Sequence, residues 1–146
     1  MGKLKSICIS QERGVLKNEV DECMVVAGFG IEHDGHGGEW GRQITVLNYQ
    51  SYLKAKQEHP DLDLHPGSFA ENLMVDGIDF SLIKPLSRIR LGDSVILEVS
   101  QIGKEDHPSV VTRTYGISLL PYEGLFCRVV EGGRLKKEDE AELVSQ

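Results

Sequence analysis

The chain has 146 residues, of which 40% are apolar and 27% charged, values typical of a single folded domain, here residues 1–146. Its net charge of −7 disfavours nonspecific nucleic-acid binding, which needs clustered basic residues. No apolar run is long enough to cross a membrane, and none follows the first lysines, so we expect a cytoplasmic location.

The predicted strands are short, rich in β-branched residues and mostly separated by Gly, Asp, Asn or Pro. In chain order they cover Lys5–Ser10, Met24–Gly28, Ile44–Asn48, Glu71–Val75, Ser87–Gly92, Ser94–Ile102, Leu125–Glu131 and Ala141–Ser145. Eight short strands with turn signals between them predict a mainly β protein whose sheet closes, or nearly closes, into a barrel.

Helices are expected at one or two places only. Asn48 is a suitable cap for a helix over Tyr49–Glu58, with Tyr49, Tyr52 and Leu53 on its inner side, and a proline follows at position 60. A second short helix is predicted within Pro108–Pro121.

The most unusual segment is the glycine-rich stretch "GIEHDGHGGEWGRQITVL" at positions 30–47. It lacks the third glycine and the following helix of a dinucleotide-binding loop. His33, Asp34 and His36 are possible metal ligands, although their spacing in a glycine-rich loop fixes no geometry. A simple turn would explain Gly35, Gly37 and Gly38, which tolerate positive φ angles.

Arg42 and Gln43, beside these glycines, favour an alternative to a simple turn. A planar guanidinium next to an amide and histidines suits an oxyanion, and backbone N–H groups exposed by the glycines would complete an anion-binding nest. Metal site, turn and anion site remain open at this point.

Two further polar clusters also adjoin strands. Glu71 and Asn72 begin a predicted strand just after a Pro66-Gly67 turn, and the run Lys104-Glu105-Asp106-His107 follows the longest strand. Either cluster alone is compatible with a solvated loop. Together with the glycine-rich stretch they predict one ligand site at the rim of the barrel.

Four segments in order resemble one known family, the MOSC domain, named for the C-terminal domain of molybdenum cofactor sulfurase. The resemblance covers nearly the whole chain. It rests on "GIEHDGHGGEWGRQITVLN", "HPGSFAENLMVDGIDF", "LGDSVILEVSQIGK" and "EGLFCRVVEGGRLK". The family implies a β-barrel-like fold and association with the molybdenum cofactor, a metal held by a pterin that ends in phosphate.

The resemblance also implies roles for individual residues. Carried over by position, the cofactor-binding residues are Arg42, Gln43, Glu71, Asn72, Lys104 and His107. Gln43 and Asn72 would give neutral hydrogen bonds, and His36, an expected catalytic residue, would orient them or transfer a proton. Many relatives have a cysteine in the pattern K-x-C-H, where this chain has Asp106, so Asp106 is the other expected catalytic residue and the expected metal ligand. A carboxylate cannot carry persulfide sulfur, which argues against a sulfur-carrier mechanism.

The three cysteines, Cys8, Cys23 and Cys127, form no CxxC pair and are expected to be buried thiols. The chain leaves no room for the pyridoxal-phosphate-dependent domain of full-length sulfurases, so no pyridoxal phosphate is expected. Expected partners are a small-molecule ligand or cofactor and molybdenum cofactor biosynthesis proteins, with neither nucleic acid nor membrane.

Three functional hypotheses follow, and whether the protein is an enzyme stays open. The favoured one is binding of molybdenum cofactor, or a related anionic ligand, at the barrel rim without catalysis. The second is a molybdenum-dependent reductase or transferase in which Asp106 ligates the metal, since oxygen ligands suit oxidised molybdenum. The third is a hydrolase with zinc bound by His33, His36 and Asp106.

Overall fold

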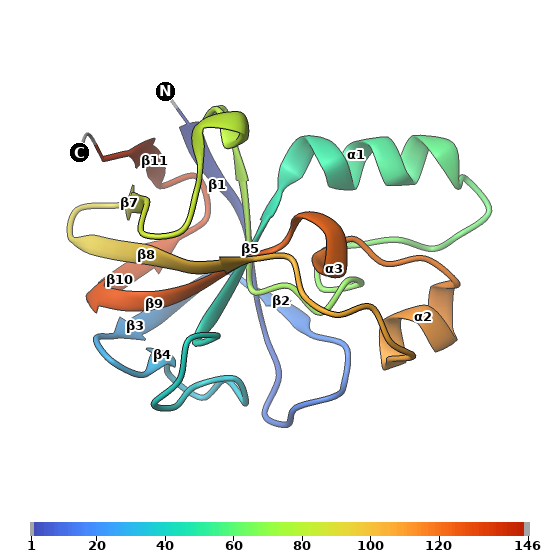
Figure 1. Cartoon of the computed structure of the whole chain (residues 1–146), viewed down its shortest axis with the longest axis horizontal. Coiled ribbons are helices and arrows are strands. Elements are labelled where there is room, and N and C mark those ends of the chain that lie inside the picture. Colours follow the sequence, from blue (N-terminus) through green and yellow to red (C-terminus); the bar gives the residue numbers. More distant parts are fainter. Residues whose placement is uncertain (1, 145–146) are drawn as a thin grey trace.

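The computed structural model describes residues 2–144 and consists mainly of strands (Figure 1). The strands are β1 (Gly2–Ile9), β2 (Asn18–Val20), β3 (Glu22–Val26), β4 (Gly30–Ile31), β5 (Ile44–Asn48), β6 (Leu73–Asp76), β7 (Arg88–Leu91), β8 (Val95–Ile102), β9 (Leu125–Glu131), β10 (Gly133–Lys136) and β11 (Glu140–Leu143). The helices are α1 (Tyr49–Glu58), α2 (Val110–Tyr115) and α3 (Leu120–Glu123), with a 3₁₀ turn at Phe80–Leu82.

Seven strands form a closed barrel. Hydrogen bonding runs in the order β11-β7-β8-β9-β5-β6-β1, and β1 pairs again with β11, where Gly2 lies opposite Ala141. All these pairs are antiparallel except β5–β6, which α1 and the loop after it connect as a parallel pair. Strand β2 extends the sheet beside β1, and β10, β3 and β4 form a second small sheet.

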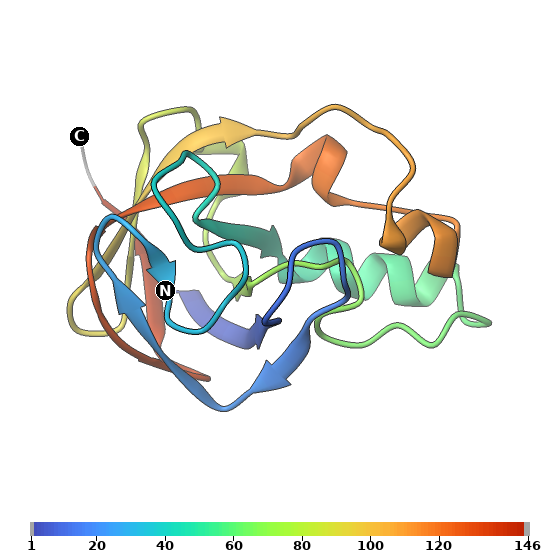
Figure 2. The same ribbon diagram turned by 90° about the horizontal axis from the view of Figure 1, so that it is seen from below.

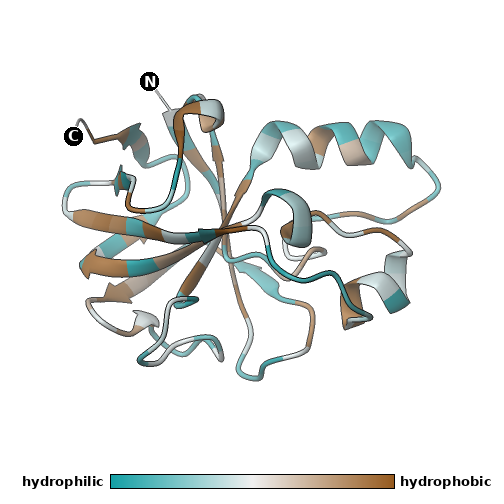
Figure 3. Ribbon diagram, viewed as in Figure 1, coloured by the Kyte–Doolittle hydropathy of each residue, from teal (hydrophilic) through white to brown (hydrophobic). Residues whose placement is uncertain are grey.

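Alternating side chains fill the barrel with an apolar core. In β7, Ile89 and Leu91 are buried whereas Arg88 and Arg90 are exposed, which is the two-residue period of a sheet with one wet face. The apolar stretches of the barrel strands are visible in Figure 3. The buried residues of this core are Leu4, Ile7, Val25, Ile31, Ile44, Val46, Leu73, Val75, Ile83, Ile89, Leu91, Val95, Leu97, Val99, Leu125, Cys127, Val129, Leu135 and Ala141.

A second apolar cluster joins the helices to the outer face of β5, β6 and β9. Tyr52 and Ala55 of α1, Val111 of α2 and Leu120 of α3 pack there with Phe126. The helices therefore stand on one side of the barrel, as Figures 1 and 2 show. Within residues 2–144, no helix is both long and apolar enough to span a membrane.

The predicted barrel is confirmed, and β5, β9 and α1 have the predicted bounds. Asn48 caps α1, since its side chain accepts a hydrogen bond of 3.0 Å from the Gln50 N–H. Leu53, expected on the inner side, is 38% exposed, and Ala55 is buried instead. Ser145, the predicted end of the last strand, lies outside the described residues.

The short strands β2, β4 and β10 and the helix α3 were not predicted. Strands of two to four residues carry too little alternation to be recognised, and they form because longer neighbours supply their hydrogen bonds. The four-residue helix α3 has a proline among its first residues, a position that proline tolerates.

Gly67 gives a test of how closely the loop before β6 packs. Its φ is 94°, and a Cβ atom would lie 2.1 Å from the carbonyl oxygen of Lys17. Gly67→Ala should lower the free energy of unfolding by roughly 3 kcal/mol or more, from backbone strain and the clash. Gly14→Ala is the control, because Gly14 has a φ of 77° with no heavy atom within 4 Å. Urea denaturation measures both, and equal losses would contradict the packing described.

Candidate functional site

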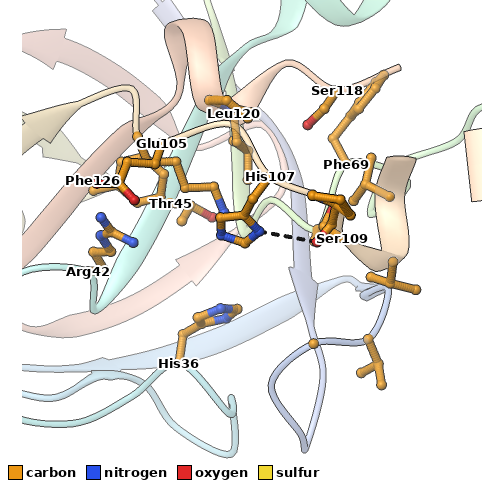
Figure 4. Close-up of a pocket in the computed structure, with 18 of the residues that line it drawn as sticks. His36, Arg42, Thr45, Phe69, Glu105, His107, Ser109, Ser118, Leu120 and Phe126 are labelled. Carbon is orange, nitrogen blue, oxygen red and sulfur yellow. Dashed lines mark hydrogen bonds between the residues drawn. The ribbon is translucent and has the colours of Figure 1, made fainter. Parts of the chain in front are cut away.

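A cavity of about 320 Å³ lies between the glycine-rich loop, the end of the barrel and helices α2 and α3. We call it the cationic pocket. Its volume is at the lower end of the range for small-molecule sites. Figure 4 shows side chains from these separate segments around it. Its lining is Gly14, Val15, His36, Trp40, Arg42, Thr45, Phe69, Ala70, Lys104, Glu105, His107, Pro108, Ser109, Val110, Val111, Arg113, Ser118, Leu120, Pro121 and Phe126.

Four of the predicted site residues line this pocket: His36, Arg42, Lys104 and His107. They come from the glycine-rich loop and from the segment after β8, so the fold brings these two sequence clusters together. Gln43, Glu71, Asn72 and Asp106 are not part of the lining.

Arg42 and Lys104 are basic residues of the pocket lining that lie over the same aromatic ring. The guanidinium carbon of Arg42 lies 5.2 Å from the centre of the Phe126 ring, and the Lys104 amine lies 5.9 Å from the same centre. Within residues 2–144, neither has an acidic partner, and Arg42 makes only a 3.4 Å hydrogen bond to Gln101. Two unpaired cations on one ring favour an anion between them.

His36 presents an unpaired nitrogen near these cations. Its Nδ1 atom is buried, has no hydrogen-bond partner within residues 2–144, and lies 3.8 Å from the nearer Asp34 oxygen. Burial above all, and then the positive charge of Lys17, lowers the pKa of His36 to about 4. The ring is therefore neutral near pH 7, so the contact with Asp34 is not an ion pair at that pH.

A buried ion pair holds the glycine-rich loop in place. The Lys17 amine lies 2.8 Å from an Asp34 carboxylate oxygen, and both side chains are 0% exposed. The same oxygen accepts a hydrogen bond from the Ser10 N–H at 3.0 Å, and the other accepts one from the His36 N–H at 3.2 Å. The Asp34 side chain is thus enclosed by this network, has no exposed surface and is not part of the pocket lining.

The anion-binding nest predicted for the glycine-rich loop is not formed. Its backbone N–H groups bond within the protein: Gly35 to Ser10 O, Gly37 to Asp34 O, and Gly38 to Phe29 O. Glycine is needed here for close approach, because a Cβ on Gly37 would lie 2.3 Å from the Phe29 ring. Of the three glycines expected at positive φ, only Gly38 has one, at 146°.

Gln43 and Asn72 use their amide groups to join backbone segments. Gln43 donates to Gly38 O and accepts from the Val129 N–H, both at 2.9 Å, and so ties the loop to β9. Asn72 accepts from the Thr45 N–H and donates to Cys8 O, both at 3.0 Å, which connects three strands. Both side chains are buried, and these bonds position the wall of the pocket rather than its contents.

Glu71 has a similar structural position, although it carries a titratable group. Its carboxylate accepts from the Gly67 N–H at 2.8 Å and from the Phe69 N–H at 3.2 Å, so it shapes the loop that places Phe69 in the pocket. Burial raises the pKa of Glu71 to about 7 despite these hydrogen bonds.

Asp106 points to a different neighbour. It is exposed and accepts a hydrogen bond from the Tyr122 hydroxyl of α3. His33, the other outlying member of the proposed zinc site, has a side chain that is 79% exposed. In the described part of the chain, no three His, Cys, Asp or Glu side chains are grouped to hold a metal ion. The zinc site with His33, His36 and Asp106 is therefore wrong as a geometric prediction.

The cysteines also lie outside the pocket lining. Cys8 and Cys127 are buried and Cys23 is half-buried. Burial raises the pKa of Cys23 and of Cys127 to about 12, and that of Cys8 higher still. They are thiols rather than reactive thiolates at neutral pH.

Sequence reasoning missed several residues of the site. Trp40 stacks with the His36 ring, its indole N–H donates to His36 O at 2.7 Å, and Arg13 lies 4.4 Å from the Trp40 ring centre. Val111 and Arg113 of α2 also line the pocket, and α2 packs against the rest of the protein through Val111. Only Trp40, the single tryptophan, gave a visible signal beside Arg42.

The described residues form a small β-barrel with a pocket on its helical side, and the pocket lining includes basic side chains without acidic partners. The MOSC domain family matches residues 32–142, which is more than half of the chain, so this chain belongs to the MOSC domain family. The resemblance read from its four sequence segments is confirmed. The family is associated with molybdenum cofactor-related proteins.

Solved structures have the same fold at low sequence identity. The YuaD protein of Bacillus subtilis is 20% identical with a TM-score of 0.74, over 97% of this chain and 94% of that one. YiiM of Escherichia coli is 24% identical with a TM-score of 0.69, over 99% and 70%. YiiM of Geobacillus stearothermophilus is 16% identical with a TM-score of 0.74, over 99% and 76%. No curated protein matches the chain.

Lys17→Met tests the buried ion pair, because it leaves the Asp34 charge buried without its partner. The free energy of unfolding should fall by roughly 3–5 kcal/mol, measured by urea denaturation. Lys5→Met is the matched control, since Lys5 pairs with Glu138 at the surface, and its unfolding should change little. The double variant Lys17→Met/Asp34→Leu should recover part of the loss. No recovery would mean that the charge of Asp34 is not the cause.

Glu71→Gln tests the titration of the buried carboxyl group. The pKa of Glu71 rises from its ordinary value of 4.5 to about 7 on folding, so the unfolded chain releases its proton first. Glu71 therefore destabilises the fold increasingly as pH rises from 4.5 to 7, by roughly 3 kcal/mol in total, and by a constant amount above pH 7. The unfolding free energy of the wild type minus that of Glu71→Gln should fall over this range. A difference independent of pH would contradict the assignment.

Proposed function

We propose that this protein binds molybdenum cofactor, or a closely related anionic pterin, in the cationic pocket. The observation that carries the proposal is the pair of unpaired cations, Arg42 and Lys104, on the Phe126 ring inside a protein of net charge −7. Acidic residues outnumber basic ones by 23 to 16, yet neither of these two side chains has an acidic partner in the described chain. Two basic groups together in a cavity are consistent with an anion as the occupant.

The residues of the pocket fit the chemistry of the cofactor's pterin and phosphate groups. Arg42 and Lys104 would hold its anionic groups, and the neutral imidazole of His36, which lines the pocket, would form a hydrogen bond with a polar group of the pterin. Phe69 and Phe126 supply apolar surface for a planar ring. When bound, the cofactor would supply a redox-active metal.

Binding without catalysis is the function that we favour. Asp106, which stands where many relatives have cysteine, is engaged by Tyr122 and is not part of the pocket lining. Its proposed role as catalytic residue and metal ligand therefore has no support from geometry. Gln43, Glu71 and Asn72 would act by positioning the pocket wall, and His107, an exposed residue of the pocket lining, would contact the ligand (Figure 4).

The binding proposal predicts the effect of removing either cation. Arg42→Gln or Lys104→Gln should weaken binding of a phosphorylated pterin about 10- to 100-fold, the loss expected for one hydrogen bond to a charged group. Fluorescence of Trp40, the single tryptophan, which lines the pocket, measures the affinity directly. Lys54→Gln, an exposed lysine of α1, should bind like the wild type. Equal affinity in all four proteins would overturn the proposal.

Analysis of molybdenum and pterin in protein purified from a host that makes the cofactor separates binding from metal ligation. The wild type should retain pterin, and Arg42→Gln should lose it. Asp106→Cys should not raise the molybdenum content if residue 106 stays outside the pocket. A gain of molybdenum in Asp106→Cys would instead restore residue 106 as a metal-ligand position.

A further inference from the structure

The amine of Lys104 has an unusual setting for a lysine. It is half-buried in the cationic pocket and makes no hydrogen bond or ion pair within residues 2–144. The amine nitrogen lies 5.9 Å from the centre of the Phe126 ring. Lys104 lies two residues after the end of β8. Its backbone N–H donates a hydrogen bond of 3.0 Å to Pro121 O of α3, which fixes the backbone at this point.

The Lys104 amine lines the pocket without a hydrogen-bond or ion-pair partner among the described residues, which leaves it available to a carbonyl compound bound there. Burial lowers the pKa of the Lys104 amine, and the positive charge of Arg42 lowers it further. The titratable and charged groups that share the pocket are His36, which is neutral, Arg42, Glu105, His107 and Arg113. A lysine that is desolvated beside a second cation is the usual setting of lysines that attack carbonyl groups.

We propose that Lys104 forms an imine with an anionic aromatic aldehyde bound in the cationic pocket. This inference rests on the proposed anion-binding function, because Arg42 must hold the anionic group of the aldehyde. The apolar wall of Phe69, Val111 and Leu120 selects an aromatic body over a small aliphatic one.

The reaction is balanced without an oxidant or reductant. A Lys104 amine that has released its proton to solvent adds to the carbonyl carbon, and one proton moves from nitrogen to the carbonyl oxygen. The resulting carbinolamine loses one water molecule, and a carbon–nitrogen double bond forms. The neutral imidazole of His36 in the same pocket can accept a proton during this transfer.

Trapping with 4-formylbenzoate and cyanoborohydride tests the proposal on the full chain. Reduction of the imine adds the mass of the aldehyde less one oxygen atom, and mass spectrometry of peptides finds the modified lysine. We expect the adduct on Lys104 before any other lysine. Benzaldehyde, which lacks the carboxylate, should label Lys104 more slowly. In Arg42→Gln the two aldehydes should label at similar rates.

Two lysine variants separate the pocket from the surface. Lys104→Arg keeps the charge and should lose the preferred adduct, whereas Lys54→Arg on the exposed side of α1 should keep it. Labelling that is spread evenly over the exposed lysines, or is unchanged in Lys104→Arg, overturns the proposal.

A binding measurement on the same proteins shows whether a negative labelling result overturns only the imine proposal or also the proposed binding of anions in the cationic pocket. Terephthalate has two carboxylates and no aldehyde, and its binding changes Trp40 fluorescence if the pocket takes aromatic anions. Terephthalate binding without labelling by 4-formylbenzoate overturns the imine proposal alone. Neither binding nor labelling overturns both. Protection of Lys104 from labelling by terephthalate supports both.

Discussion

The site depends on one buried ion pair, between Lys17 and Asp34. Neither side chain is exposed to solvent, and the carboxylate also binds the backbone N–H groups of Ser10 and His36. The segment before β2 and the glycine-rich loop are thereby held against each other although 17 residues separate the two charges. Since an ion pair in such a setting requires every hydrogen bond to be made, it fixes one loop conformation and with it the orientation of His36.

The polar groups around the pocket divide into two kinds. Those behind its lining are hydrogen-bonded to the backbone, whereas two basic groups of the lining have no acidic partner among residues 2–144. Gln43, Glu71 and Asn72 are fully engaged by backbone groups. Arg42 and Lys104, which face the cavity, are left without acidic partners in the described chain. This division distinguishes the residues that shape a ligand site from those that contact the ligand, and side-chain type alone does not reveal it.

The sequence predicted the barrel well because longer strands rich in apolar and β-branched residues, such as β8 and β9, carry their own signal. The polar clusters noted beside the strands include Arg42 and Lys104, which the fold places in one pocket lining. The sequence did not separate ligand-facing from wall-supporting polar residues, as Asn72 illustrates, because burial is decided by contacts between distant segments. Lys17 was missed entirely, since a lone lysine in a turn is normally solvated, and only the fold places Asp34 against it.

Closure of the barrel has a consequence for how the protein is made. The pairing of Gly2 in β1 with Ala141 in β11 joins strands from nearly opposite ends of the described chain. Such a contact forms late, because the loop that it closes is almost the whole protein. During synthesis, β1 therefore keeps an unpaired edge until β11 has emerged from the ribosome, and β2 and β6 are its earlier pairing partners. Variants that slow this final pairing would lengthen exposure of an aggregation-prone edge without altering the finished ligand site.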